Sequence, residues 1–138
     1  MRFVLDASVS LAWFLDHPVP ALAMKAKQIL ASGSRAVVPA LWHLEMANGL
    51  AVSERRGIID ADDVEKSAAY IEQMFGNAIE NMDATISFRY ALATARTLQL
   101  TAYDGVYLET ARSEGIPLAT LDKSLRAAAL KVGVELFR

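Results

Sequence analysis

The chain has 138 residues, the length of one domain that can bury a core without disulfides or a structural metal to hold it together. It contains no cysteine, which excludes disulfides, thiolate metal sites and cysteine nucleophiles, and which agrees with a cytoplasmic location. Its net charge of −2 neither supports nor excludes a nucleic-acid partner, because carboxylates engaged by a metal would leave the remaining surface positive.

The sequence predicts neither a secretory signal nor a membrane span. The apolar run at the beginning of the chain is interrupted at Asp6, before it reaches the length of a signal sequence. The most apolar later segment, 36–52, contains a proline, a histidine and Glu45, and it is shorter than the roughly 20 residues that cross a bilayer. We therefore expect a cytoplasmic protein with no membrane contact.

The first half of the chain alternates short apolar runs with longer helical patterns. Ser8 is a predicted helix cap, Pro39 stops the second apolar run, and Gly57 ends the helix that follows it. Asp60 and Asp63 resemble a capping arrangement at the next helix. In chain order, the expected elements are a strand at 2–5, helices at 8–15 and 21–31, a strand at 36–38, and helices at 40–56 and 60–75.

The second half continues the alternation, with Asp83 as the predicted cap of its first helix. The elements expected there are helices at 84–98 and 102–113, a strand at 117–121, a helix at 122–132 and a strand at 134–137. This alternation predicts an α/β fold, a three-layer α/β/α sandwich with a central, mainly parallel sheet of four to five short strands. No repeat or linker divides the chain, so residues 1–138 are expected to form a single domain.

Three aspartates follow predicted strands or open predicted helices. Asp6 and Asp122 come directly after strands, and the carboxyl ends of parallel strands border the ligand crevice of such folds. Ordinary roles are also available, because Asp122 can cap a helix and Asp104 lies in a first helical turn, where an acid is favourable. Asp6 is harder to explain in this way, since Ser8 is the better-placed cap. These aspartates suggest a site without establishing it.

Glu45 is the most informative acid, because the helix that contains it is apolar nearly all round. On a helical wheel Leu41 and Val52 lie beside it on the same face, and the opposite side is apolar as well. We expect such a helix to be buried, so that Glu45 needs a cation, a proton or a strong donor. Arg56 or another basic residue is the ordinary partner. The alternative is a divalent metal, which binds carboxylates, activates water and stabilises charge on a phosphodiester.

Other kinds of active site lack their residues in this sequence. His17 and His43 do not have the spacing of a zinc site, and the sequence places no histidine or lysine as a base for Ser8. No glycine-rich phosphate loop is present. Most other acids are explained as helix caps or solvated positions.

Each of the four candidate acids lies in a longer stretch, and the residue pattern of these stretches and the spacing between them resemble those of a known protein family. The stretches are FVLDAS at 3–8, VPALWHLEMAN at 38–48, TAYDGVYL at 101–108 and PLATLD at 117–122. In this order and spacing they resemble the PIN-domain nucleases, and more closely the VapC-type toxins of bacterial toxin–antitoxin pairs. The resemblance covers nearly the whole chain.

The resemblance implies a PIN-like α/β/α fold and metal-dependent endonucleolytic cleavage of RNA with Mg²⁺ or Mn²⁺. It also implies a homodimer and a cognate antitoxin whose tail covers the active-site groove. Three polar positions that lie beside the site in the family would orient ligands or water, and the acids would form the metal site. The implied acids are Asp6, Glu45, Asp104 and Asp122, and the polar residues are Ser8, Asn48 and Thr120.

Two alternative functions remain open at the level of sequence. A non-catalytic interaction domain would keep the fold and use its acids as helix caps. A metal-dependent phosphatase would use a similar sheet, although phosphatases with an aspartyl nucleophile often carry a second Asp two residues later, where this chain has Ser8. The identity of the RNA is also open, because base recognition depends on the shape of loops.

Overall fold

A four-stranded parallel sheet forms the centre of the protein. The structure, a computed structural model, describes residues 1–83 and 85–138. The strands are β1 (Arg2–Leu5), β2 (Arg35–Pro39), β3 (Ile79–Met82) and β4 (Leu118–Ala119), and their order across the sheet is β3-β2-β1-β4. All three pairings are parallel, with Val4 opposite both Val37 of β2 and Leu118 of β4. The sheet thus agrees with the predicted strand number and direction.

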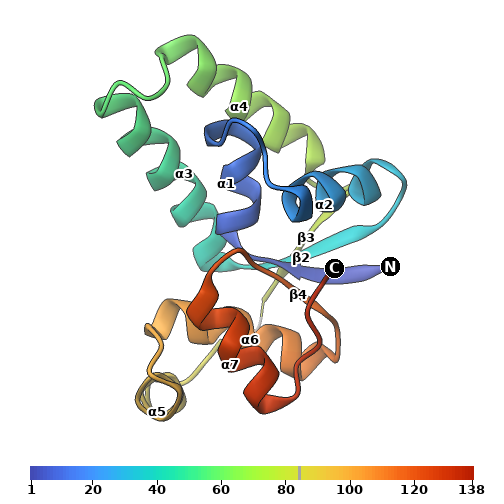
Figure 1. Cartoon of the computed structure of the whole chain (residues 1–138), viewed down its shortest axis with the longest axis vertical. Coiled ribbons are helices and arrows are strands. Elements are labelled where there is room, and N and C mark those ends of the chain that lie inside the picture. The colour runs from blue at the N-terminus through green and yellow to red at the C-terminus, as the bar shows by residue number, and fades with distance from the viewer. Residues whose placement is uncertain (84) are drawn as a thin grey trace.

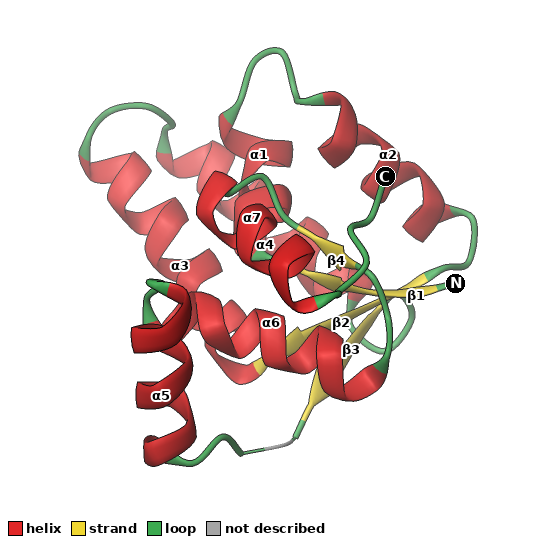
Figure 2. Cartoon of the chain, turned by 60° about the horizontal axis from the view of Figure 1, so that its bottom comes forward, coloured by secondary structure: helices red, strands yellow, loops and turns green. Residues whose placement is uncertain are grey.

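Helices cover both faces of this sheet (Figure 1). One layer contains α1 (Ala7–Leu15), α2 (Ala21–Ala31), α3 (Ala40–Arg55) and α4 (Ala61–Met74). The other contains α5 (Phe88–Leu98), α6 (Ala102–Glu114) and α7 (Lys123–Val132), and α6 packs along the strands (Figure 2). This arrangement confirms the predicted three-layer α/β/α sandwich. Within the described residues, no helix is both long enough and apolar enough to cross a membrane.

The two central strands are buried on both faces, as helices on either side of a parallel sheet require. Consecutive residues from Phe3 to Leu5 and from Ala36 to Val38 are completely buried. The C-terminal segment completes one edge of the core, where the Phe137 ring stacks on the Phe3 ring with centroids 4.6 Å apart. The predicted strand at 134–137 is nevertheless wrong. Because its neighbour β4 has only two residues, the pairing is reduced to a single bridge at Leu136.

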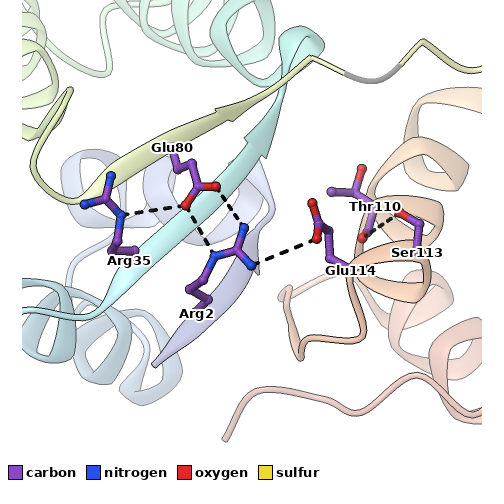
Figure 3. A network of polar contacts seen from close by, with 6 residues as sticks. All are labelled: Arg2, Arg35, Glu80, Thr110, Ser113 and Glu114. Atoms are coloured by element: carbon purple, nitrogen blue, oxygen red, sulfur yellow. Dashed lines mark hydrogen bonds and ion pairs between the residues drawn. The ribbon is translucent and has the colours of Figure 1, made fainter.

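The edge strand β3 was not predicted, because only Ile79 of its four residues is buried and the strand contains Glu80 and Asn81. Ion pairs of Glu80 connect this strand to the rest of the sheet. The Glu80 carboxylate accepts a hydrogen bond of 2.8 Å from Arg2 of β1 and lies 3.7 Å from the Arg35 guanidinium of β2 (Figure 3). Arg2 also lies 3.9 Å from Glu114 of α6. These partly exposed pairs connect three strands and one helix.

The helix expected at 84–98 begins later than predicted. Its expected first residue, Ala84, lies outside the described residues, and α5 begins at Phe88. Ser87, rather than Asp83, is its cap, and the Ser87 hydroxyl accepts a hydrogen bond from the Tyr90 amide. None of the α5 side chains is buried, so this helix lies at the surface along its whole length.

Helices α1 and α3 pack closely, and this contact fixes the relation between two segments that carry candidate site residues. The buried Trp42 indole of α3 donates a hydrogen bond of 3.0 Å to the Ser10 hydroxyl of α1. Further along α3, Gly49 leaves room for Leu11, because a Cβ at Gly49 would lie 2.6 Å from the Leu11 Cδ2 atom. The absence of a side chain at residue 49 therefore allows the two helices to pack closely.

We expect Ser10→Ala to lower the free energy of unfolding by about 1–3 kcal/mol, because the buried Trp42 N–H loses its acceptor. Urea denaturation measures this change. Ser32→Ala is the matched control, since the exposed Ser32 hydroxyl bonds only to a carbonyl of its own helix, and it should have little effect. Equal stability of the two variants would contradict the importance of the Trp42–Ser10 bond.

Candidate functional site

A pocket of about 320 Å³ lies at the carboxyl end of the parallel sheet, and all four predicted acids line it. They come from four separate segments. Asp6 follows β1, Glu45 lies in α3 after β2, Asp104 lies in the first turn of α6, and Asp122 precedes α7. Ser8 and Asn48 also line the pocket, and none of its lining residues in the described part of the chain is basic. The fold thus gathers carboxylates that are distant in the sequence.

Asp6 is the most deeply buried of the acids, with only 4% of its surface exposed. Its Oδ2 atom accepts hydrogen bonds from the Ser8 hydroxyl at 2.6 Å and from the buried Thr120 hydroxyl at 2.7 Å. The Asp6 side chain makes no capping bond to α1, in which Ser8 is already a helical residue. The prediction that Ser8 caps this helix is therefore wrong, and its hydroxyl instead serves Asp6.

The two hydroxyls also fix the loop that carries Asp122. The Leu121 amide donates to the Ser8 hydroxyl at 3.0 Å, and the Asp122 amide donates to the Thr120 hydroxyl at 3.1 Å. Each hydroxyl thus donates to the Asp6 carboxylate and accepts from the loop after β4. This network orients Asp6 and holds the loop against the end of β1.

Glu45 is half-buried and has a partner that the sequence reasoning missed. The Tyr107 hydroxyl donates a hydrogen bond of 2.6 Å to its Oε1 atom. The expectation that α3 is buried all round is wrong, because the adjacent Leu44 is 74% exposed, and the alternative partner Arg56 is exposed at the helix end. The available signal for Tyr107 is its position three residues after Asp104, which places both side chains on one face of α6.

The other two aspartates combine an ordinary helix role with a place in the pocket. Asp122 caps α7, and its Oδ1 atom accepts a hydrogen bond of 2.7 Å from the Leu125 amide. Asp104 lies in the first turn of α6, where its amide is capped by the Thr101 hydroxyl. The predicted cap at Asp122 is confirmed, and it leaves Asp122 among the residues that line the pocket.

The electrostatics of the pocket favour the binding of a cation. Burial, and then repulsion by neighbouring carboxylates, raises the pKa of Glu45 and of Asp104. Burial is also the main cause that raises the pKa of Asp6, with a smaller contribution from Asp122, although the Ser8 and Thr120 hydroxyls oppose the shift. The raised pKa values express the cost of placing several negative charges together in a partly dry pocket.

The donor set is suited to a hard divalent ion, because carboxylates and hydroxyls supply oxygen ligands. Within residues 1–83 and 85–138, however, no three histidine or acidic side chains are arranged so that they could hold one ion together. Mg²⁺ commonly keeps several waters and takes only one or two carboxylates directly. The pocket therefore fits a hydrated ion better than a closed shell of protein ligands.

Comparisons with known proteins agree with this architecture. The family model described as PIN domain matches residues 3–131. The crystal structure of PAE2754 from Pyrobaculum aerophilum is similar in fold, with a TM-score of 0.68 and 23% sequence identity. The similarity covers 93% of this chain and 79% of that one. No curated protein gave a match.

In EDTA at pH 7, we expect Asp6→Asn to be at least as stable as the wild-type protein, because the amide has the same shape without the buried charge. A carboxyl whose pKa is higher in the folded than in the unfolded state stabilises the fold as the pH falls through that range. The wild-type protein should therefore gain stability relative to Asp6→Asn as the pH falls from 7 toward the ordinary Asp pKa of 3.8. Thermal unfolding followed by circular dichroism measures both trends, and a wild-type protein that loses stability relative to the variant would contradict the burial argument.

Proposed function

Since the chain belongs to the PIN domain family, whose members are generally metal-dependent nucleases, we propose that it is an endoribonuclease that uses Mg²⁺ or Mn²⁺ and acts in the cytoplasm. The observation that carries the proposal is the convergence of Asp6, Glu45, Asp104 and Asp122 on one pocket. Four carboxylates without a basic side chain among the described lining residues form a site for positive charge, and a phosphodiester can approach them only when that charge is supplied.

We assign the binding of a hydrated ion to Asp6, Glu45 and Asp104, which would hold it directly or through its water molecules, with Asp122 completing this site or a second one. When bound, a divalent ion activates water as the nucleophile and stabilises negative charge on the phosphodiester and on the leaving oxygen. Ser8 and Thr120 orient Asp6 through their hydroxyls. These two hydroxyls and Asn48 are the groups to which we assign the orientation of ligands and water.

The surroundings of the pocket supply a candidate phosphate contact. The Arg126 guanidinium of α7 donates a hydrogen bond of 2.9 Å to the Thr120 carbonyl, which places its positive charge close to the acidic pocket. An arginine held by one bond retains further donors for a phosphate. We propose that Arg126 contacts the RNA backbone next to the cleaved bond.

We further propose that the protein is the toxin of a VapBC-type toxin–antitoxin pair, and that a cognate antitoxin covers the active-site groove. The resemblance in sequence motifs supports this assignment. The pocket supports it physically, because acidic lining residues favour a basic partner segment that would compete with the metal for Asp6 and its neighbours.

The first test is cleavage of RNA by the purified protein with Mg²⁺ or Mn²⁺. Loss of an outer partner of a metal site costs about 10–100-fold in activity, so Asp6→Asn, which alters a proposed ligand, should lose at least ~100-fold. EDTA should abolish cleavage by the wild-type protein. Asp62→Asn is the control, because Asp62 is exposed on α4 and pairs with Lys66 outside the pocket, and its activity should equal that of the wild-type protein.

Three results would contradict the nuclease proposal and separate it from the alternatives. Cleavage undiminished in EDTA would exclude metal dependence. Hydrolysis of a phosphomonoester with RNA left intact would favour a phosphatase. Absence of Mn²⁺ binding in calorimetry, together with intact RNA, would favour a non-catalytic interaction domain.

We propose that the protein is a homodimer with α5 in its interface. This helix packs against α6 on one side, but none of its side chains is fully buried within the chain. Phe88 is 78% exposed, and Leu92, one helical turn later, is also exposed. These two side chains form an apolar stripe for which a second copy is the partner implied by the resemblance.

We expect Phe88→Glu to convert the dimer into a monomer, because it places a charge in the proposed apolar contact. Light scattering coupled to gel filtration measures the mass. Ile58→Glu is the matched control, since Ile58 is 60% exposed in the turn after α3, and this variant should remain dimeric. A monomeric wild-type protein, or a dimeric Phe88→Glu variant, would contradict the assignment.

A further inference from the structure

We propose that Tyr107 is a positioning residue, which fixes the Glu45 carboxylate relative to Asp104 and thereby raises the affinity of the pocket for a divalent ion. The inference rests on the proposed metal-dependent function, and it concerns a residue outside the set of acids and small polar side chains that line the pocket. Tyr107 does not line the pocket itself. It acts through the carboxylate that it holds.

The geometry of the contact is that of an anchored donor. The Tyr107 side chain is completely buried in the core, so the packing of the ring fixes the position of its hydroxyl. The hydroxyl donates to Glu45 Oε1 at 2.6 Å, the distance of a strong hydrogen bond to a carboxylate. Because this bond engages one oxygen of Glu45, the carboxylate is restrained in orientation while its second oxygen is available to a cation.

The position of Tyr107 in α6 explains why the restraint concerns two acids at once. Tyr107 lies three residues after Asp104, so the helix itself fixes the distance between the phenol and the Asp104 backbone. Glu45 belongs to α3, in the layer on the opposite face of the sheet (Figure 1). The Tyr107–Glu45 bond therefore connects the two helical layers at the acidic pocket and sets the spacing of acids that belong to different layers.

A second tyrosine–glutamate hydrogen bond, from Tyr90 of α5 to Glu109 of α6, serves as a comparison, because it does not orient a carboxylate for a cation. The Tyr90 hydroxyl donates to Glu109 Oε2 at 2.5 Å, and the Arg112 guanidinium donates to both Glu109 oxygens at 2.7 Å. Glu109 is thus neutralised by a cation of the protein. Among the described residues no basic side chain forms an ion pair with Glu45, so Tyr107 orients a carboxylate whose charge remains uncompensated.

The experiment compares Mn²⁺ binding to Tyr107→Phe, Tyr90→Phe and wild-type protein by calorimetry after treatment with EDTA. Phenylalanine keeps the buried ring and removes only the hydroxyl. We expect Tyr107→Phe to bind Mn²⁺ about 10-fold or more weakly, as loss of an outer-shell partner does, and Tyr90→Phe to bind like the wild-type protein. Saturating Mn²⁺ should restore most of the RNA cleavage by Tyr107→Phe, since the four acids remain.

Thermal unfolding with and without Mn²⁺ separates positioning from a purely structural role. A ligand that binds the folded state raises the midpoint of unfolding, and at a given concentration the increase is larger for a ligand that binds more tightly. A structural role would lower the midpoints of Tyr107→Phe in EDTA and in Mn²⁺ equally, whereas positioning predicts a smaller Mn²⁺-induced increase. Glu45→Gln sets the upper limit, because an effect transmitted through Glu45 cannot exceed the loss of its charge.

The outcomes distinguish this inference from the proposed function. Equal Mn²⁺ affinity of Tyr107→Phe and wild-type protein would overturn the role of Tyr107 and leave the nuclease proposal intact. A larger loss in Tyr107→Phe than in Glu45→Gln would also overturn it, since the effect would then not pass through Glu45. A wild-type protein that binds no Mn²⁺ would overturn both proposals.

Discussion

The buried carboxylate of Asp6, at the end of a central parallel strand, is the constraint on which the rest of the site depends. A parallel sheet with helices on both faces leaves its strand ends as the place where polar side chains can gather, and β1 delivers Asp6 there with almost no exposure to solvent. Two hydroxyls satisfy the carboxylate, and these hydroxyls in turn hold the loop that carries Asp122. One desolvated charge thus organises both the local hydrogen bonds and the approach of a second acid.

The surrounding helices partly offset the negative charge of the pocket acids, but they do not neutralise it. Helices α1, α6 and α7 begin beside the pocket, with Asp6, Asp104 and Asp122 at or near their first residues. The positive ends of helix dipoles stabilise such acids modestly. The raised pKa values of Asp6 and Asp104 indicate that burial and repulsion outweigh this help. The pocket therefore retains an affinity for added positive charge, and the fold restrains the acids that would otherwise move apart.

The sequence was sufficient for much of the fold, because continuous apolar runs at β1 and β2 and a cap at Asp122 depend on short-range patterns. It failed where tertiary contacts decide. Strand β3 lies at an edge, is short and has Glu80 and Asn81 at its centre, so its residues show no clear strand pattern. The exposure of Leu44 shows that the apolar character of α3 does not reveal which of its faces the neighbouring elements cover. Tyr107 reaches Glu45 across 62 residues of sequence, and no local pattern encodes such a bond.

The pairing of β1 with β4 has a consequence for the order of events during folding. Thr120 lies 114 residues after the carboxylate to which it donates, and Asp122 follows it in the same loop. Contacts of such high sequence separation form late, after loop closure has been overcome, and a growing polypeptide cannot make them before its C-terminal part has been synthesised. The acidic pocket is therefore incomplete in any partly synthesised chain. The proposed metal-dependent activity would therefore require that β4 has docked beside β1.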